Sequence, residues 1–284
     1  LFVTLLFDIT QVRTSWLMSA RSDGVVGSRL LSGSAAVKGF LLLLETLPKS
    51  KWVRWDPKAH SPEETSGVLG LASFAWMNQL FLAGFKRILT LDDLLSLDRN
   101  MATEALRSRL TEKLDNLASG GQKYGLTKAL AKTLLVPLLL PIGPRVALIG
   151  FRFCQPFLIN TLLDYLQPET HRSEKRKDAG YGLIGASVLI YGGIAVSTAL
   201  YWYFHERMLC MCRGSLAGVI YEKVTEVELS TASDSAAVTL MSTDVERIRL
   251  GFLNLHEFWA NTIEVGLASW LVERELGAAF VAPL

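Results

Sequence analysis

The feature that most constrains this chain is a pair of apolar stretches, 182–204 and 252–272, which a patterned polar connector separates. A helix of about 23 residues reaches roughly 34 Å, enough to cross a hydrocarbon core of about 30 Å. Each stretch therefore predicts a transmembrane helix. The connector, residues 205–251, is too long and too regular to be a simple loop.

The connector predicts two amphipathic helices joined by a turn of small residues at 230–236. The apolar positions at helical spacing are Leu209, Leu216, Ile220, Val224 and Val227, then Leu240 or Met241, Val245, Ile248 and Phe252. A helix of about 25 residues would carry the turn on the order of 35 Å beyond the membrane. Such a hairpin, continuous with its membrane spans, is a lever that a partner outside the membrane can push.

The composition agrees with a membrane protein. The chain is 50% hydrophobic and 20% charged, with a mean hydropathy of +0.29, and a soluble domain is rarely so apolar. The net charge of +2 says little about partners, and the chain has no acidic or basic tail. No nucleic-acid partner is expected. The three cysteines, Cys154, Cys210 and Cys212, imply no disulfide framework. The last two point about 200° apart on a helix, which favours packing over metal binding.

The two ends of the chain lie inside apolar runs. The chain begins with Leu1 and finishes within residues 276–284, and it has no recognisable signal peptide, so we expect a fragment of a longer membrane protein. Residues 1–18 are expected to be the tail of a transmembrane helix. Residues 30–47 are a weaker candidate span, for which an amphipathic surface helix is the alternative, because charges such as Lys38 interrupt it.

The middle of the chain changes character. The order Ser-Pro-Glu-Glu at 61–64 predicts a helix start. The aromatic stretch 68–85 is expected to form a helix that lies along the membrane interface rather than crossing it. Residues 126–166, which four prolines interrupt, predict one long kinked span with a cytosolic entry helix rather than two spans. Residues 171–178 predict a short loop. Basic residues flank both sides of the spans, so the length of the connector, not the charge bias, places it in the cytoplasm.

Several segments of the chain resemble a known family. SPEETSG at 61–67, FAWMNQLF at 74–81 and LTLDDL at 89–94 are similar to the linker before the first core transmembrane domain of multidrug-resistance-associated (C-subfamily) ABC transporters, most closely the fungal members. LMSTDVER at 240–247 resembles the stretch after the first coupling helix of the same proteins. The likeness covers nearly the whole chain.

The resemblance implies an all-α, polytopic membrane protein with part of an ABC exporter type-1 transmembrane domain and long cytosolic helical extensions. Residues 1–47 would be the end of an extra N-terminal membrane domain, 48–125 a cytosolic or interfacial linker, and 126–284 the truncated transmembrane domain. The implied function is ATP-driven export of amphipathic organic anions, conjugates or drugs. The implied location is the plasma or vacuolar membrane.

The implied partners are membrane lipid, an amphipathic small-molecule substrate, and the nucleotide-binding domains and second transmembrane domain of the same full-length protein. The chain has no Gly-x-x-x-x-Gly-Lys-Ser/Thr phosphate loop, so ATP and Mg²⁺ are implied for those other domains and no cofactor for this chain. ASGGQK at 118–123 looks like an ABC signature loop, but it lacks the structural context, and chance explains it better. Alone, the chain is expected neither to hydrolyse ATP nor to transport.

The candidate pathway residues are polar or aromatic side chains at membrane depth: Arg145, Arg152, Trp202, Asn254, Glu257 and Asn261. Arg145 and Arg152 lie two helical turns apart, and they either capture anions or snorkel to the interface. Trp202 either stacks on an amphipathic substrate or belongs to an interfacial aromatic belt.

The third predicted span carries a polar stripe and one histidine. Glu257, Asn261 and Glu264 are expected to share a helix face, which looks toward a cavity or bonds to another helix. His256 has no second histidine or cysteine at ligand spacing, which argues against a metal site. The coupling turn, expected to dock on a nucleotide-binding domain, is assigned to Ser230, Ser233, Asp234 and Ser235.

Two other classes of protein are compatible with this sequence. A channel or receptor would use the same polar faces without ATP, and a membrane-anchored interaction protein would use residues 48–125 as its binding module. The long helical connector favours the exporter. The sequence also shows no re-entrant filter and no repeated pore ring, either of which would favour a channel.

Overall fold

The computed structural model describes residues 2–18, 22–47, 49, 60–118, 125–166, 173–226 and 239–277. Over these residues the chain forms helices and no β-strand, which confirms the predicted all-α class. The chain divides into two compact units, Leu1–Ser96 and Leu97–Leu284, and each is described by itself.

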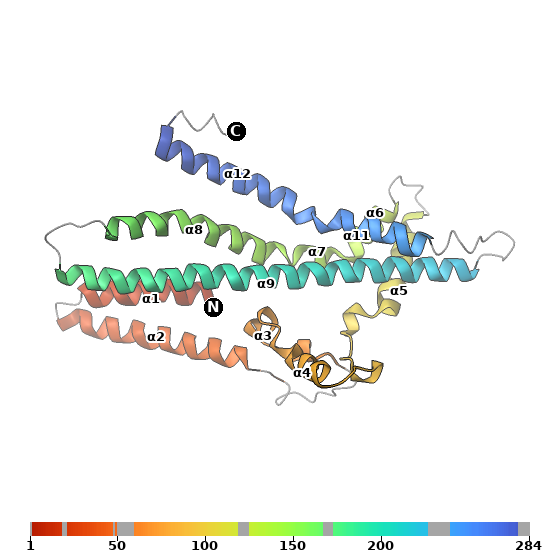
Figure 1. The fold of residues 1–284 in the computed structure, drawn as a ribbon, viewed down its shortest axis with the longest axis horizontal. Helices are drawn as coiled ribbons and strands as arrows, with labels where there is room; N and C mark the ends of the chain where they lie inside the picture. Colours follow the sequence, from red (N-terminus) through yellow and green to blue (C-terminus); the bar gives the residue numbers. More distant parts are fainter. Residues whose placement is uncertain are drawn as a thin grey trace. The chain divides into compact units, whose positions relative to one another are not determined.

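The first unit begins with a hairpin of α1 (Phe2–Met18) and α2 (Ser22–Thr46), drawn in red and orange in Figure 1. Lys38 of α2 forms an ion pair with Asp8 of α1. This pairing lowers the cost of placing a charge at membrane depth. The segment Val25–Glu45 is long and apolar enough to cross a membrane, so the second candidate span starts earlier than the predicted residue 30.

Four short helical pieces follow in the first unit: the 3₁₀ turn η2 (Pro62–Thr65), α3 (Val68–Ala72), the 3₁₀ turn η3 (Ala75–Met77) and α4 (Asn78–Lys86). Ser61 caps η2 as its sequence predicts, because its side chain accepts a hydrogen bond from the Glu63 N–H. In the next turn, η4 (Leu91–Asp93), hydrogen bonds from the backbone and side chain of Thr90 lower the pKa of the Asp93 carboxyl.

The prediction of one continuous helix over 68–85 is wrong. Phe74 has a φ of 53° and a ψ of 26°, the left-handed region that ends a right-handed helix. Ser73 adds to the break, because its hydroxyl donates a hydrogen bond to the Leu69 carbonyl oxygen. The pieces on either side, with 5 and 9 residues, are too short to cross a bilayer as helices. Their position along the membrane interface stays a prediction.

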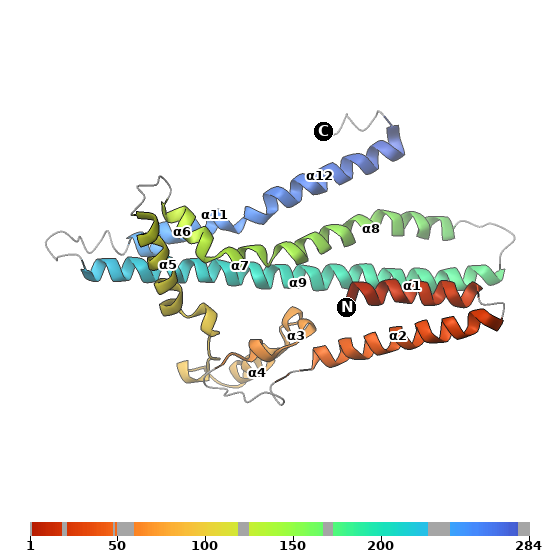
Figure 2. The same cartoon turned by 180° about the vertical axis from the view of Figure 1, so that it is seen from behind.

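The second unit is built on one very long helix. Its elements in order are η5 (Arg99–Met101), α5 (Thr103–Ala118), α6 (Gly125–Thr133), α7 (Leu135–Leu139), α8 (Ile142–Leu166), α9 (Ser173–Glu226), the π-helical turn η6 (Leu240–Asp244), α11 (Val245–Leu253) and α12 (Leu255–Leu276). The 54 residues of α9 measure about 80 Å. Figures 1 and 2 show α8 along the first half of α9, and α5, α6 and α11 around its second half.

Two predicted spans of this unit are confirmed by length and composition. The segments Leu135–Leu166 and Gly180–Glu226 are both long and apolar enough to cross a membrane. The first is one kinked span, as predicted, because α7 and α8 follow each other directly with a break at Leu140 and Pro141. With Val25–Glu45, these segments make the chain a multi-pass integral membrane protein.

The third predicted span, 252–272, differs from its prediction. A break at Asn254 separates α11 from α12, so the second limb of the connector is not continuous with its span. With 22 residues α12 has the length of a span, but Glu257 and Glu264 make it less apolar. It is not among the described helices that are both long enough and apolar enough to cross a membrane. That α12 crosses the membrane stays a prediction.

The predicted helix of the first limb of the connector is confirmed, since α9 runs without a break to Glu226. That this limb extends beyond the membrane stays a prediction. The loop predicted at 171–178 is wrong from residue 173 onward, because α9 already begins at Ser173. The segment after Ser173 is rich in Glu, Lys and Arg, which have high helix propensity. The helix therefore extends past the apolar part of the sequence.

Around its second half, α9 forms a hydrophobic core with the neighbouring helices. The buried members are Leu106, Leu110, Ala129, Leu130, Leu134, Met211, Cys212, Leu216 and Val245. Helix α5 approaches α9 closely at Gly218, where an added Cβ would lie 3.0 Å from Thr103 Cγ2. Beside this contact, Arg107 Nη1 lies 3.3 Å from Glu222 Oε1. Helix α5 is thereby fixed to α9.

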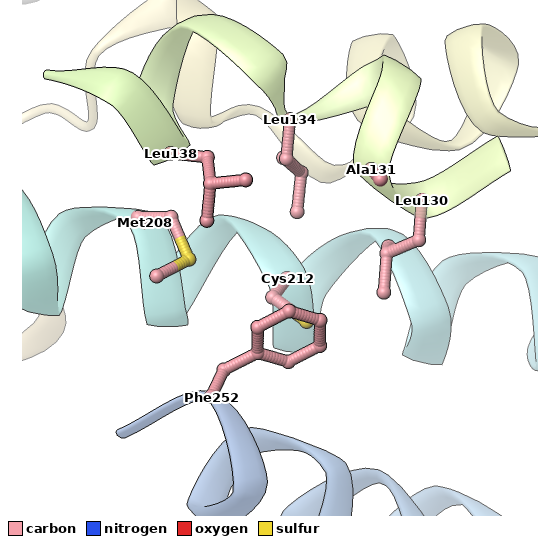
Figure 3. A pocket seen from close by; sticks show the side chains of 7 residues that line it. All are labelled: Leu130, Ala131, Leu134, Leu138, Met208, Cys212 and Phe252. Atoms are coloured by element: carbon pink, nitrogen blue, oxygen red, sulfur yellow. The ribbon is translucent and has the colours of Figure 1, made fainter. Parts of the chain in front are cut away.

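A small apolar hollow remains in this core, and Figure 3 shows its lining. The side chains come from three places: Leu130, Ala131, Leu134 and Leu138 from α6, α7 and their junction, Met208 and Cys212 from α9, and Phe252 from α11. Cys212 is buried here and Cys210 is exposed, as their predicted opposite directions require. The stripe predicted for α11 therefore packs on α9.

Candidate functional site

Four charged side chains connect α8 with α12. Arg145 Nη2 donates a hydrogen bond to Glu257 Oε2 at 2.8 Å and lies 3.5 Å from Glu264 Oε1. Arg152 Nη1 also lies 3.5 Å from Glu264 Oε1. Each helix contributes two residues that are seven positions, or about two turns, apart. We refer to Arg145–Glu257 as the first pair, to Arg152–Glu264 as the second pair, and to all four residues as the charge cluster.

A side chain from α9 completes the first pair. The Tyr201 hydroxyl donates a hydrogen bond to Glu257 Oε1 at 3.0 Å. The guanidinium carbon of Arg145 lies 5.4 Å from the centre of the Tyr201 ring, within cation–π range. Both oxygens of Glu257 therefore accept a hydrogen bond, and the first pair links α8, α9 and α12.

The second pair is looser than the first. Both guanidinium contacts of Glu264 are 3.5 Å long, and its Oε1 is buried with no hydrogen-bond donor among the described residues. Figures 1 and 2 show that α12 diverges from α8 toward its C-terminal end. Glu264 lies further along α12 than Glu257, and the longer contacts follow from this divergence.

The break between α11 and α12 is stabilised from α9. A helix that ends at Leu253 leaves carbonyl oxygens without donors in its own helix. His205 Nε2 lies 2.9 Å from the Leu253 carbonyl oxygen, and it is the donor, because a carbonyl oxygen only accepts. The Glu257 N–H donates to the Asn254 carbonyl oxygen at 3.0 Å and starts α12. A side chain of another helix therefore stabilises the break after which α12 takes its own direction.

His256 has a histidine neighbour that the sequence spacing did not predict. The rings of His205 and His256 have centroids 5.5 Å apart, and His205 also stacks on Tyr201 at 5.4 Å. The Trp259 Nε1–H donates a hydrogen bond to His256 Nδ1 at 3.1 Å. Over the ranges that the structure describes, no three His, Cys, Asp or Glu side chains gather to hold a metal ion. The two histidines belong to an aromatic cluster between α9 and α12.

The other predicted pathway residues are more exposed. Trp202 is 43% exposed and contacts the Tyr201 ring edge-on, with centroids 5.3 Å apart. Asn254 forms the helix break, and Asn261 is exposed whereas Glu257 and Glu264 are half-buried. The structure thus brings Arg145, Arg152, Glu257 and Glu264 together and leaves Asn261 at the surface of α12.

Sequence reasoning missed two residues of the site, Tyr201 and His205. They lie four positions apart on α9, and both are fully buried together with Leu209. The signal available in the sequence was a tyrosine and a histidine four positions apart inside an apolar helix. Such polar groups need partners if they become buried. The predicted coupling turn, with Ser230, Ser233, Asp234 and Ser235, lies outside the described residues.

The fold and the charge cluster define a multi-pass helical membrane protein whose internal charges are paired between helices. No family model matches the chain. Over its whole length, the chain is 46% identical to the ABC-type transporter braE of Annulohypoxylon truncatum and 44% identical to the ABC transporter FGM5 of Gibberella zeae. It is 36% identical, again over its whole length, to the ABC multidrug transporter B of Aspergillus fumigatus.

The chain spans 19% of the length of each of these relatives. Similarity of this extent over the whole chain shows that the chain is homologous to a segment of fungal ABC transporters.

Proposed function

We propose that the chain is a membrane-spanning part of an ATP-driven ABC exporter of the C-subfamily, for amphipathic organic anions, conjugates or drugs. The observation that carries this proposal is the similarity to fungal ABC transporters along the whole chain, one of them named a multidrug transporter. The length of α9 supports it, because a continuous helix of about 80 Å transmits a displacement from one end to the other.

In this proposal the charge cluster and its surroundings belong to the substrate pathway. Arg145, Arg152, Trp202, Asn254, Glu257 and Asn261 would line it. A guanidinium pairs well with the carboxylate or sulfonate of an organic anion, and the exposed ring of Trp202 would pack on the apolar part of the same molecule. Arg145 already pairs with Glu257, so a substrate anion reaches it only in competition with a carboxylate of the protein.

Coupling to ATP would involve residues outside the described ranges and other domains of the full-length protein. The turn at Ser230, Ser233, Asp234 and Ser235 would dock on a nucleotide-binding domain of the full-length protein. ATP and Mg²⁺ would bind in such domains, since the chain contains no phosphate loop. Closure of those domains would push α9 and α11, and the break at Asn254 would let α12 change direction. The proposed location is the plasma or vacuolar membrane, and the chain alone would be inactive.

Transport by the full-length protein tests the exporter proposal. Inside-out membrane vesicles that contain it are expected to accumulate the organic anion carboxyfluorescein several-fold more with MgATP than with MgAMP, because export is driven by hydrolysis. Vesicles that contain only this 284-residue chain are expected to show no ATP-dependent uptake. Equal uptake with both nucleotides would indicate a channel and contradict the proposal.

Cross-linking tests the coupling turn. Cysteine at Ser233 or Ser235 is expected to form a bismaleimide cross-link with a cysteine on a nucleotide-binding domain, because two amphipathic helices converge on this turn. Cysteine at Ser34, on α2, serves as the control and should give no such product. The shifted band on a denaturing gel is the measurement. Absence of a cross-link from every position in 230–237 would rule out the assignment.

A further inference from the structure

We propose that Glu264 is an internal counter-ion of the substrate pathway, and that the anionic group of a substrate replaces it beside Arg152. The inference rests on the proposed function and adds to it the residue that an anion must displace. It also predicts which of the two pairs in the charge cluster opens and which stays closed.

The geometry of Glu264 is that of a group with incomplete bonding. One oxygen, Oε1, lies 3.5 Å from both Arg145 and Arg152 and accepts a hydrogen bond from neither. The Nε of Arg145 is also buried and finds no acceptor among the described residues. Two guanidinium groups thus share one carboxylate oxygen, with donors left over. A ligand carboxylate or sulfonate offers two or three oxygens to the same donors.

The first pair has no comparable deficit. Glu257 accepts hydrogen bonds from Arg145 and from Tyr201 at 2.8 and 3.0 Å, and the Arg145 side chain is 5% exposed. Opening this pair would leave a buried guanidinium uncompensated, which is costly. An incoming anion therefore exchanges at the second pair, where less is lost.

Lower burial also favours the second pair. The side chain of Arg152 is 46% exposed and that of Glu264 is 30% exposed, against 5% for Arg145, so an anion can reach the second pair with less displacement of packed side chains. A neutral compound gains nothing from this exchange. The second pair therefore discriminates anionic from uncharged or cationic amphipaths.

Removal of the internal carboxylate tests this inference. In the purified full-length protein, Glu264→Gln is expected to lower the Kd of carboxyfluorescein about fivefold, because the competitor of the anion is gone. The Kd of the cationic dye rhodamine 123 should stay the same or rise. Fluorescence anisotropy measures both. Glu273→Gln, at an exposed position of the same helix, is the matched control and should change neither Kd.

A second variant keeps the test specific. Arg152→Gln combined with Glu264→Gln should return the Kd of carboxyfluorescein to the original value or above it, because the cation that the anion needs is then absent. An unchanged or higher Kd in Glu264→Gln alone, or an equal gain for both dyes, would overturn the inference. The exporter proposal depends on ATP-dependent uptake and not on this Kd, so either idea can fail while the other stands.

Discussion

Replacing Glu257 by Ala is expected to destabilise the full-length protein by about 3 kcal/mol. The substitution removes the 2.8 Å partner of Arg145, whose side chain is 5% exposed, and it leaves the Tyr201 hydroxyl without its acceptor. Breaking one partner of a buried ion pair costs about 3–5 kcal/mol, and the remaining 3.5 Å contact with Glu264 offsets part of that loss. Thermal unfolding of the detergent-solubilised protein measures the effect.

Two further variants separate the ion pair from a general effect of mutation. Replacing both partners, Arg145→Met with Glu257→Leu, should recover most of the stability, because a buried pair can be exchanged for apolar packing at little cost. Glu273→Ala, at the exposed end of α12, should change stability by less than about 0.5 kcal/mol. If Glu257→Ala unfolds at the same temperature as the unmodified protein, the first pair does not form in the membrane.

Gly193→Ala is expected to destabilise the contact between α8 and α9 by about 1–3 kcal/mol. A Cβ at this buried position would lie 2.5 to 2.7 Å from three ring carbons of Phe151, closer than atoms in contact can approach. The ring or the helix must move. The midpoint of thermal unfolding should therefore fall, and ATP-dependent uptake should fall with it if the proposed exporter function is correct.

The neighbouring glycine provides the matched control. An added Cβ at Gly192 meets no atom within 4 Å, and Ala favours a helix over Gly by about 1 kcal/mol, so Gly192→Ala should leave stability unchanged or raise it. Phe151→Leu in the Gly193→Ala background should restore part of the loss by making room for the methyl group. Equal effects of Gly192→Ala and Gly193→Ala would contradict the packing described for α8 and α9.

The charge cluster shows where sequence reasoning about the site succeeds and where it stops. The spacing of seven residues between Arg145 and Arg152 is visible in the sequence, and so is the spacing between Glu257 and Glu264. That these two patterns face each other is not visible, because 112 positions separate Arg145 from Glu257. Pairing at this distance depends on how α8 and α12 rotate and pack. The role of Tyr201, on a third helix, depends on the same packing.

Helix breaks were predicted well only where the residue type forces them. Pro141 lacks a backbone N–H, so the kink before α8 follows from local chemistry. Phe74 and Asn254 carry no such restriction. At Asn254 the break is stabilised by His205 of α9, which donates a hydrogen bond to the Leu253 carbonyl oxygen. A sequence gives no direct sign of a partner that arrives from another helix.

By itself, the sequence determined the all-α class, the apolar segments of spanning length, the kinked span and the long helix that continues beyond residue 204. These features depend on residue type and on the 3.6-residue period, which are local properties. Tertiary structure alone decided which charges are paired, which histidines meet and which of the two arginines stays accessible. The reason is that a charge at membrane depth is stabilised by partners on other helices, and their positions depend on how the helices pack.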